Sequence, residues 1–428
     1  MTQFKRARVS DGTDGTACQQ HVQSKDACRF VVERTIRLPQ SIGRVAAIAA
    51  WSMDQAKPNS TPSTTLTTTE TTQNDQTSKN NAQNPLVAIG TDTGCIALVR
   101  MTDDDVTVID HGSSGNSSNG NGTAAIQRIL MAKSATAPTG APGIIIPSAS
   151  TAHSAPDMVA GDADGRVTVF TLGRLFSRTT LSAPVSALAA DTNPHTPHGY
   201  LVGDMGGSVT SYHTQEMRWR VQLDPYAAEL TMSNGHISAL LDRDDPQVTG
   251  ICAVQWADDT GVPTRYVLAA TGTQIQVLCH GTFVLPVHLR ARCTALCAGS
   301  FTASQEGSTQ AIVGDETGCL YVLDRFTLTP YARVAHPITR ISVLAHHALS
   351  ASGGPDIVVC STQSNSVYLL CAGKTIGTYV ADVWPTDVAI IESLSAERRC
   401  PALVVAETVG RMGTQEHHCW LKVVAIEE

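Results

Sequence analysis

Short runs of consecutive apolar residues recur along the chain, each followed by a few polar residues and then by a second apolar-rich run. The segment AIVGDETGCLYVLD at 311–324 predicts two strands joined by a tight turn. Runs of four or five apolar residues are typical of strands covered on both faces. Six further segments repeat the pattern: LVAIGTDTG (86–94), DMVAGDADG (157–165), YLVGDMGG (200–207), YVLAATGTQ (266–274), DIVVCSTQSN (356–365) and ALVVAETVG (402–410).

Each of these hairpins has further strand-like runs on either side. Preceding runs include PVSALAA (184–190), RCTALCAG (292–299), PITRISVLA (337–345) and TDVAII (386–391), and following runs include WRVQL (219–223), FVLPVHL (283–289) and PYARVA (330–335). The turn positions Ala270, Gly314, Cys360 and Ala406 are separated by 44, 46 and 46 residues. Four strands per repeat of this length predict an all-β fold, a seven-bladed β-propeller of four-stranded antiparallel blades.

The two ends of the chain also fit a closed ring. The seventh repeat ends with the strand-like run 419–426 and lacks a fourth strand, whereas the run FVVERTIRL at 30–38 precedes the first inner strand, GRVAAIAAW (43–51). Because a single sheet cannot bury both of its apolar faces, blades must stack until the ring closes. We therefore expect the N-terminal strand to pair with 419–426 and to complete the last blade.

Polar tracts interrupt the repeats and predict insertions in the loops. We expect a disordered tail at 1–29 and one propeller domain at 30–428. Segment 54–84 consists almost wholly of Thr, Ser, Asn, Gln and Pro, which predicts a disordered loop. The expected insertions are the disordered loop 54–84, the low-complexity loops 111–124 and 134–156, and the irregular segment 224–247.

Composition narrows the classes of partner. Hydrophobic residues make up 42% of the chain and charged residues 16%, which favours buried β structure. The net charge of −8 provides no basic field for nucleic acid. With no apolar stretch long enough for a signal peptide or a membrane helix, we expect a cytoplasmic protein that does not insert into a membrane. We expect its twelve cysteines to form no structural disulfides.

Candidate chemistry is sparse. Asp162 and Asp164 alternate ahead of a glycine, as carboxylates in a calcium loop do, but they make only half of such a loop. An Asx-type hairpin turn, in which Asp bonds its own backbone, is the favoured interpretation. Cys293 with Cys297, and the run 417–419, supply too few ligands at a recognised spacing, so core or loop roles are favoured.

No catalytic or cofactor-binding residue stands out, and we predict a non-catalytic interaction scaffold without a cofactor. Its expected partners are other protein subunits rather than a small-molecule ligand. A propeller enzyme with an active site in the central channel remains an open alternative, because sequence spacing does not reveal residues assembled from several blades.

Three turns resemble a known repeat family. VAGDADGRVTV (159–169), LVGDMGGSVTS (201–211) and IVGDETGCLYV (312–322) resemble the FG-GAP and quinoprotein-like propeller repeats, and none of the five Trp residues is followed by Asp, as WD repeats require. The segments RTIRLPQSIGRVAAIAAW (34–51) and PLVAIGTDTGCIALV (85–99), with RWRVQLD (218–224) and LPVHLRARCTALCAG (285–299), look closest to the integrin-alpha FG-GAP repeat-containing proteins.

This resemblance implies a subunit of a cytosolic adaptor assembly that recruits a GTPase-activating complex to the lysosome in nutrient signalling. A ciliary or trafficking coat propeller would have the same sequence features, and that alternative stays open.

Overall fold

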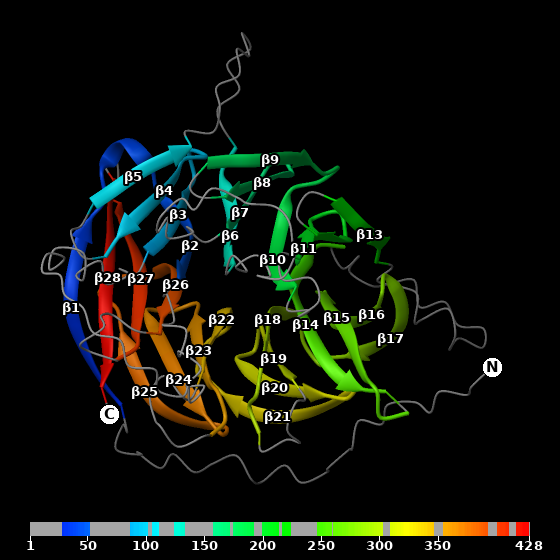
Figure 1. Cartoon of the computed structure of the whole chain (residues 1–428). Coiled ribbons are helices and arrows are strands. Elements are labelled where there is room, and N and C mark those ends of the chain that lie inside the picture. The colour runs from blue at the N-terminus through cyan, green and yellow to red at the C-terminus, as the bar shows by residue number, and fades with distance from the viewer. Residues whose placement is uncertain are drawn as a thin grey trace, which may run out of the picture.

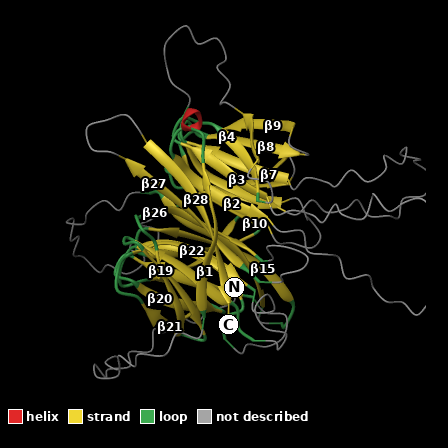
Figure 2. Cartoon of the chain, turned by 90° about the vertical axis from the view of Figure 1, so that its left-hand side faces the viewer, coloured by secondary structure: helices red, strands yellow, loops and turns green. Residues whose placement is uncertain are grey.

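The protein is a ring of seven four-stranded antiparallel β-sheets, the arrangement of a seven-bladed β-propeller (Figure 1). This computed structural model describes residues 28–51, 86–101, 105–110, 124–132, 157–171, 174–191, 199–213, 216–223, 246–258, 260–302, 309–345, 354–392, 400–410 and 417–427. Among these residues, one short 3-10 turn, η1 (Gln40–Ile42), is the helical element (Figure 2). The predicted fold class is confirmed.

In blades 1 to 6 the strands pair in their order along the sequence. Blades 1 and 2 contain β2 (Val45–Trp51), β3 (Leu86–Thr91), β4 (Ile96–Arg100), β5 (Asp105–Asp110), β6 (Ile126–Ala132), β7 (Asp157–Asp162), β8 (Arg166–Thr171) and β9 (Arg174–Thr180). Blades 3 and 4 contain β10 (Val185–Asp191), β11 (Gly199–Asp204), β12 (Ser208–His213), β13 (Glu216–Gln222), β14 (Val248–Ala257), β15 (Pro263–Thr271), β16 (Gln274–Cys279) and β17 (Thr282–His288). Blades 5 and 6 contain β18 (Cys293–Gly299), β19 (Gln310–Asp315), β20 (Cys319–Asp324), β21 (Thr327–Arg333), β22 (Ile338–Leu344), β23 (Ile357–Thr362), β24 (Ser366–Cys371) and β25 (Lys374–Val380).

Blade 7 joins the two ends of the chain, as the sequence predicts. It consists of β26 (Pro385–Ile391), β27 (Ala402–Gly410), β28 (His417–Glu427) and, as its outer strand, β1 (Arg29–Arg37). β1 pairs antiparallel with β28, with Phe30 opposite Ile426 and Ile36 opposite Leu421. Figures 1 and 2 both show the two strands side by side. The ring is therefore closed by hydrogen bonds between strands nearly four hundred residues apart in the sequence.

The first strand of each blade lines the axis of the ring and contacts the first strand of the next blade. Each of these inner strands has a register irregularity after its first paired residue. In blades 3 and 4 a hydroxyl at the irregular position links neighbouring blades. Ser186 Oγ donates to Val248 O at 2.7 Å, and Thr249 Oγ1 donates to Cys293 O at 2.8 Å.

The repeated spacing of small residues in the hairpins has a packing cause. The sequence interpretation placed Gly161 and its equivalents in turns, but the structure places Gly161 within strand β7. A Cβ built on Gly161 would lie 2.4 Å from Val185 Cγ1, at the start of the next inner strand. Gly90, Gly203 and Gly314 meet Ile126, Val248 and Ile338 in the same way, at 2.3, 2.5 and 2.9 Å. These glycines therefore make room for the neighbouring blade.

The turns themselves use a different set of glycines. Gly94, Gly165, Gly207 and Gly318 have φ between 77° and 84°, in the region that only glycine adopts readily. Each hairpin in those four blades thus contains one glycine for the seam between blades and a second for the turn.

Several sequence predictions fall outside the described residues. These are the tail up to residue 27, the loop 54–84, and the greater part of the insertions 111–124, 134–156 and 224–247. In the described part of the chain, no helix has the length and apolar character needed to span a membrane.

Candidate functional site

In blades 1, 2, 3 and 5, the turn between the second and third strands is closed by a polar side chain at the end of the second strand. Asp204 Oδ1 accepts a hydrogen bond from Ser208 N at 2.8 Å, and Asp315 Oδ1 accepts from Cys319 N at 2.9 Å. In blade 1, Cys95 N donates to Thr91 Oγ1 at 3.1 Å, so a hydroxyl oxygen can replace the carboxylate as the acceptor. These contacts satisfy backbone donors in tight turns.

Asp162 and Asp164, the sequence candidates for a metal, form such a turn. Asp162 Oδ1 accepts from the backbone N–H groups of Asp164 at 2.9 Å and Arg166 at 2.8 Å. Asp164 Oδ2 lies 3.4 Å from Arg166 Nη2. Burial raises the pKa of the Asp162 carboxyl, and the two backbone hydrogen bonds oppose that rise. The structure thus has the favoured Asx-type turn, and calcium binding at these two residues stays a prediction.

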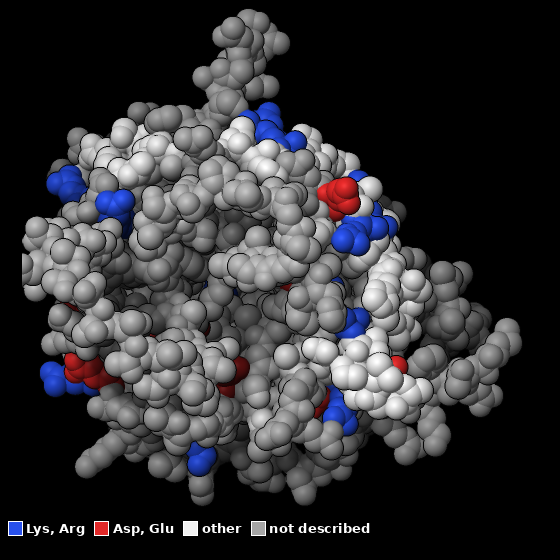
Figure 3. Space-filling model, in the orientation of Figure 1, with Lys and Arg blue, Asp and Glu red and all other residues white. Residues whose placement is uncertain are grey.

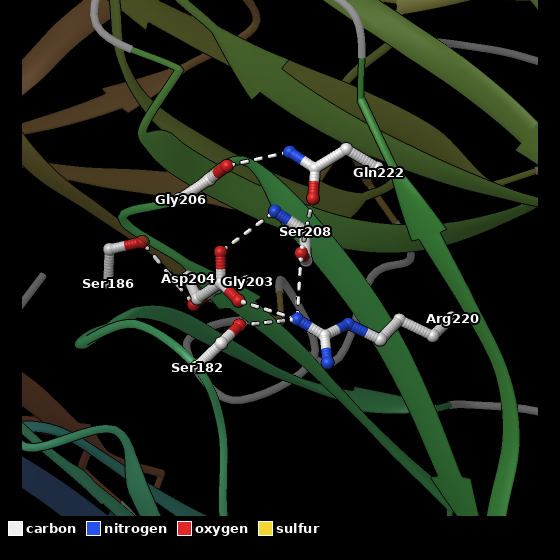
Figure 4. Close-up of polar contacts among 8 residues, drawn as sticks. All are labelled: Ser182, Ser186, Gly203, Asp204, Gly206, Ser208, Arg220 and Gln222. Carbon is white, nitrogen blue, oxygen red and sulfur yellow. Dashed lines mark hydrogen bonds and ion pairs between the residues drawn. The ribbon is translucent and has the colours of Figure 1, made fainter.

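Blade 3 extends its turn into a hydrogen-bonded network (Figure 4). Arg220 Nη2 lies 3.7 Å from the buried Asp204 Oδ2 and donates to Ser208 Oγ at 3.0 Å and to Ser182 Oγ at 2.8 Å. Ser208 Oγ in turn donates to Gln222 Oε1 at 2.7 Å. The guanidinium lies within ion-pair distance of Asp204 Oδ2 without a hydrogen bond to it, and its bond to Ser208 links strands β12 and β13.

Blade 7 places a buried ion pair at the equivalent level. Lys422 Nζ lies 2.8 Å from Glu407 Oε2 and 2.5 Å from Asp382 Oδ2. Burial opposes the charged form of Lys422, but the hydrogen bonds to Asp382 and Glu407 raise its pKa overall. The pair ties β27 to β28 within the blade that closes the ring.

The central channel contains charged side chains that the sequence did not single out. They occupy the position just after the irregularity of each inner strand. Across the seven blades that position is filled by Ala47, Arg128, Ala187, Gly250, Ala295, Arg340 and Asp387. Three blades thus place a charge where the other four have Ala or Gly.

Asp387 is buried and holds its neighbours on both sides. Its Oδ2 accepts from Arg340 Nη2 of blade 6 at 2.8 Å and from Ile48 N of blade 1 at 2.9 Å. Its Oδ1 accepts from Val388 N at 2.9 Å. Asp387 therefore connects three consecutive blades around the channel.

Arg128 of blade 2 completes the group. Its Nη1 donates to Gln127 O at 2.8 Å. The pKa of Arg128 is lowered to about 10, mainly by burial and also by the positive charge of Arg340, while the negative charge of Asp387 opposes this shift. The charges of blades 2, 6 and 7 thus act on one another across the channel. The three residues are 47 to 259 positions apart in the sequence, so no short sequence motif contains them.

The cysteine candidates belong to the core. Cys293 and Cys297 lie on inner strand β18, and burial raises the pKa of their thiols to about 12 and about 11. Burial also raises the pKa of Cys252 on the neighbouring strand β14. Thiols with such pKa values are poor metal ligands and poor nucleophiles at neutral pH.

In the run 417–419, His418 and Cys419 contact different parts of the chain. His418 Nδ1 lies 3.0 Å from Arg37 Nη2, and Cys419 Sγ donates to Gly43 O at 3.6 Å. Over the described ranges of the chain, no group of three or more His, Cys, Asp or Glu side chains is placed to hold a metal ion.

The outer strands present apolar side chains at one repeated position. Leu175, Met217 and Phe283 lie opposite Phe170, Tyr212 and Leu278, one residue from the end of the third strand in blades 2, 3 and 4. Their exposed fractions are 55%, 58% and 42%. In blade 6 the equivalent residue is the polar Thr375. We call Leu175, Met217 and Phe283 the rim arc.

Charged side chains are scattered over the ring. On the face seen in Figure 3, the described Lys and Arg residues lie apart from one another around the rim, with Asp and Glu among them. Among the described residues of this face there is no continuous cationic patch.

Comparison with known proteins supports the fold and goes no further. Neither the protein-family models nor the curated protein sequences gave a match. Among solved structures, the chain is similar to Sqt1 from Saccharomyces cerevisiae, with 12% sequence identity and a TM-score of 0.51 over 92% of this chain and 97% of that one. At this identity the likeness is one of fold alone.

Proposed function

We propose that this protein is a non-catalytic interaction scaffold, which binds another protein subunit through the rim arc. The observation that carries the proposal is the exposure of a large apolar side chain at the same register position in three consecutive blades. Single exposed apolar residues are common, but a repeated series on adjacent elements is typical of an interaction surface.

The position of these residues suits docking. Phe170, Tyr212 and Leu278 are buried against the preceding blade, and directly paired residues of a sheet project to the same side. Leu175, Met217 and Phe283 therefore lie at the outer edges of the contacts between blades 1 to 4. A partner with apolar side chains at the spacing of the blades could pack against all three.

The sequence resemblance suggests a class of partner. On the resemblance to FG-GAP repeats, we propose a cytoplasmic adaptor complex in nutrient signalling, with the other subunits of that complex as partners. The turn and strand motifs of the sequence support this assignment.

The test is quantitative co-purification from the native cell type after proximity labelling. The variant combines Leu175→Ser, Met217→Ser and Phe283→Ser, and the control is Val380→Ser, which changes a 60% exposed residue on blade 6. We expect a stoichiometric partner that is lost from the triple variant and retained by the control. Retention of every partner by the triple variant would refute the rim arc as the docking surface.

A second variant, Trp384→Ser, tests an exposed aromatic residue outside the rim arc. Trp384 is 69% exposed and lies in the connection between β25 and β26, outside blades 2 to 4. Loss of the partner from this variant alone would move the interaction to that connection. A propeller enzyme, by contrast, would carry a bound chromophore or cofactor that absorbance and intact mass detect in the purified protein.

A further inference from the structure

The charges of the central channel do not balance. The described inner strands contain four charged residues, and Asp191 at the far end of β10 pairs with Arg265. The remaining three are two arginines, Arg128 and Arg340, and one carboxylate, Asp387. One positive charge is therefore left over at this level of the channel.

Among the described contacts, no hydrogen bond joins Asp387 to Arg128. The two oxygens of Asp387 accept three hydrogen bonds, from Arg340 Nη2, Ile48 N and Val388 N. Within the part of the chain that the structure describes, the one acceptor bonded to Arg128 is the carbonyl oxygen of Gln127. A guanidinium has five N–H donors, so most donors of Arg128 are unused.

The side chains of both arginines are partly exposed. No guanidinium nitrogen of Arg128 or Arg340 is both buried and without a hydrogen-bond partner in the described structure. Arg340 also has a side chain 31% exposed, although it bonds to the buried Asp387. Both arginines can therefore offer N–H groups to a molecule inside the channel.

Arg128 lies near one end of the central channel. Ala163 N in the β7–β8 turn donates to Ala125 O at 2.9 Å, and Ala125 lies three residues before Arg128. Arg128 is thus close to the face of the ring that bears the turns between second and third strands.

We propose that the central channel binds a small multivalent oxyanion, such as a diphosphate or a tricarboxylate, between the guanidinium groups of Arg128 and Arg340. Planar guanidinium groups bind phosphate and carboxylate oxygens with paired, charge-assisted hydrogen bonds. The Arg340–Asp387 contact already shows that a carboxylate fits against one of the two arginines. This inference goes beyond the proposed scaffold function, because it involves the channel and not the rim.

The test is isothermal titration calorimetry of the full chain with sodium pyrophosphate and, separately, with citrate, at low ionic strength. We expect saturable binding of at least one anion. Arg128→Gln should weaken that binding by about tenfold or more, because it removes charged hydrogen bonds. The matched control is Arg333→Gln, which removes one exposed positive charge from outer strand β21 and should leave the affinity unchanged.

Asp387→Asn should change the anion affinity in the opposite direction from Arg128→Gln. Removing the one carboxylate raises the positive charge at this level, so we expect tighter anion binding than in the unmodified protein. Circular dichroism checks that each variant is folded, and Arg128→Lys, which keeps the charge but loses the planar fork, replaces Arg128→Gln if the latter fails to fold. Its binding should be intermediate.

Three results would overturn the proposal. The first is no binding of either anion at millimolar concentration, and the second is equal weakening by Arg128→Gln and Arg333→Gln. The third is tighter binding of a hexaglutamate peptide than of both small anions, because it would assign the arginines to an acidic polypeptide. The triple rim-arc variant should bind the anion normally, so the scaffold proposal and this one fail separately.

Discussion

The rings of Phe30 and Tyr379 pack with their centroids 5.9 Å apart, although 349 residues separate them in the sequence. Phe30 lies on β1 and Tyr379 on β25, the outer strand of blade 6. Cys28 N also donates to Ile376 O of that strand at 3.0 Å. The N-terminal strand therefore completes blade 7 and also fastens it to blade 6.

This contact should contribute to closure of the ring. Phe30→Ala is expected to lower the free energy of unfolding by about 1–2 kcal/mol, because a half-buried aromatic ring is removed. A double-mutant cycle with Tyr379→Ala, followed by denaturant unfolding, should give a coupling energy of about 0.5–1.5 kcal/mol. Val32→Ala changes an exposed side chain of the same strand and should be within about 0.5 kcal/mol of the unmodified protein. A coupling energy of zero would contradict a role for the contact in closure.

The seam glycines give a prediction that depends on the neighbouring blade. Gly161→Ala would place a methyl group 2.4 Å from Val185 Cγ1, so we expect a loss of about 1–3 kcal/mol in unfolding free energy from overpacking. Adding Val185→Ala should recover part of that loss, because it removes the clashing methyl groups. The matched control is the combination of Gly161→Ala with Val248→Ala, the equivalent valine opposite Gly203. If both double variants are equally stable, the seam explanation is wrong.

The buried pair in blade 7 should be costly to break from one side. Lys422→Met leaves Glu407, whose side chain is 3% exposed, without its partner, and we expect a loss of about 3 kcal/mol. Changing both residues, as Lys422→Met with Glu407→Leu, should recover much of the stability because no buried charge remains. Lys374→Met on the outer strand of blade 6 is the control, with little expected effect. Thermal and urea unfolding measure all four proteins, and a single variant as stable as the control would contradict the assignment.

The sequence predicted the architecture because the information is local and repeated. Apolar runs such as 311–314 and their turn residues identify strands one repeat at a time. The run at 30–38 lies outside the seven repeats, and the seventh repeat, which lacks a fourth strand, was its expected partner. The structure confirms that pairing, with β1 at Arg29–Arg37. Period and chain closure were therefore sufficient for the number of blades.

What the sequence did not reveal depends on contacts between blades. Gly161 was interpreted as part of a turn, because its packing against Val185 involves a residue of the next repeat. Arg128, Arg340 and Asp387 are each unremarkable within their own strand. Alignment of the inner strands at the irregularity, where four blades have Ala or Gly, is the signal that would have found them.

The Asp162 turn makes a prediction about pH. Its folded-state pKa is raised from the usual 3.8, mainly by burial, so the ionised form is disfavoured in the folded protein relative to the unfolded chain. The stabilising contribution of protonated Asp162 is fully present below the unfolded pKa and is lost as pH rises through the folded pKa. Asp162→Asn keeps the Oδ1 acceptor for Asp164 N and Arg166 N but does not ionise. Relative to the unmodified protein, it should therefore become more stable between pH 4 and pH 7.

Denaturant unfolding of both proteins across that pH range measures the difference directly and cancels the titration of all other groups. Asp162→Ala is the control for the hydrogen bonds: it removes the acceptor and should be destabilised by about 1–3 kcal/mol at neutral pH. The sign of the pH trend is decisive. If Asp162→Asn instead loses stability relative to the unmodified protein as pH rises, the ionised carboxylate must be favoured in the fold. In that case the two backbone hydrogen bonds, or a bound cation at Asp162 and Asp164, outweigh the cost of burial, and calcium titration of that turn becomes the next measurement.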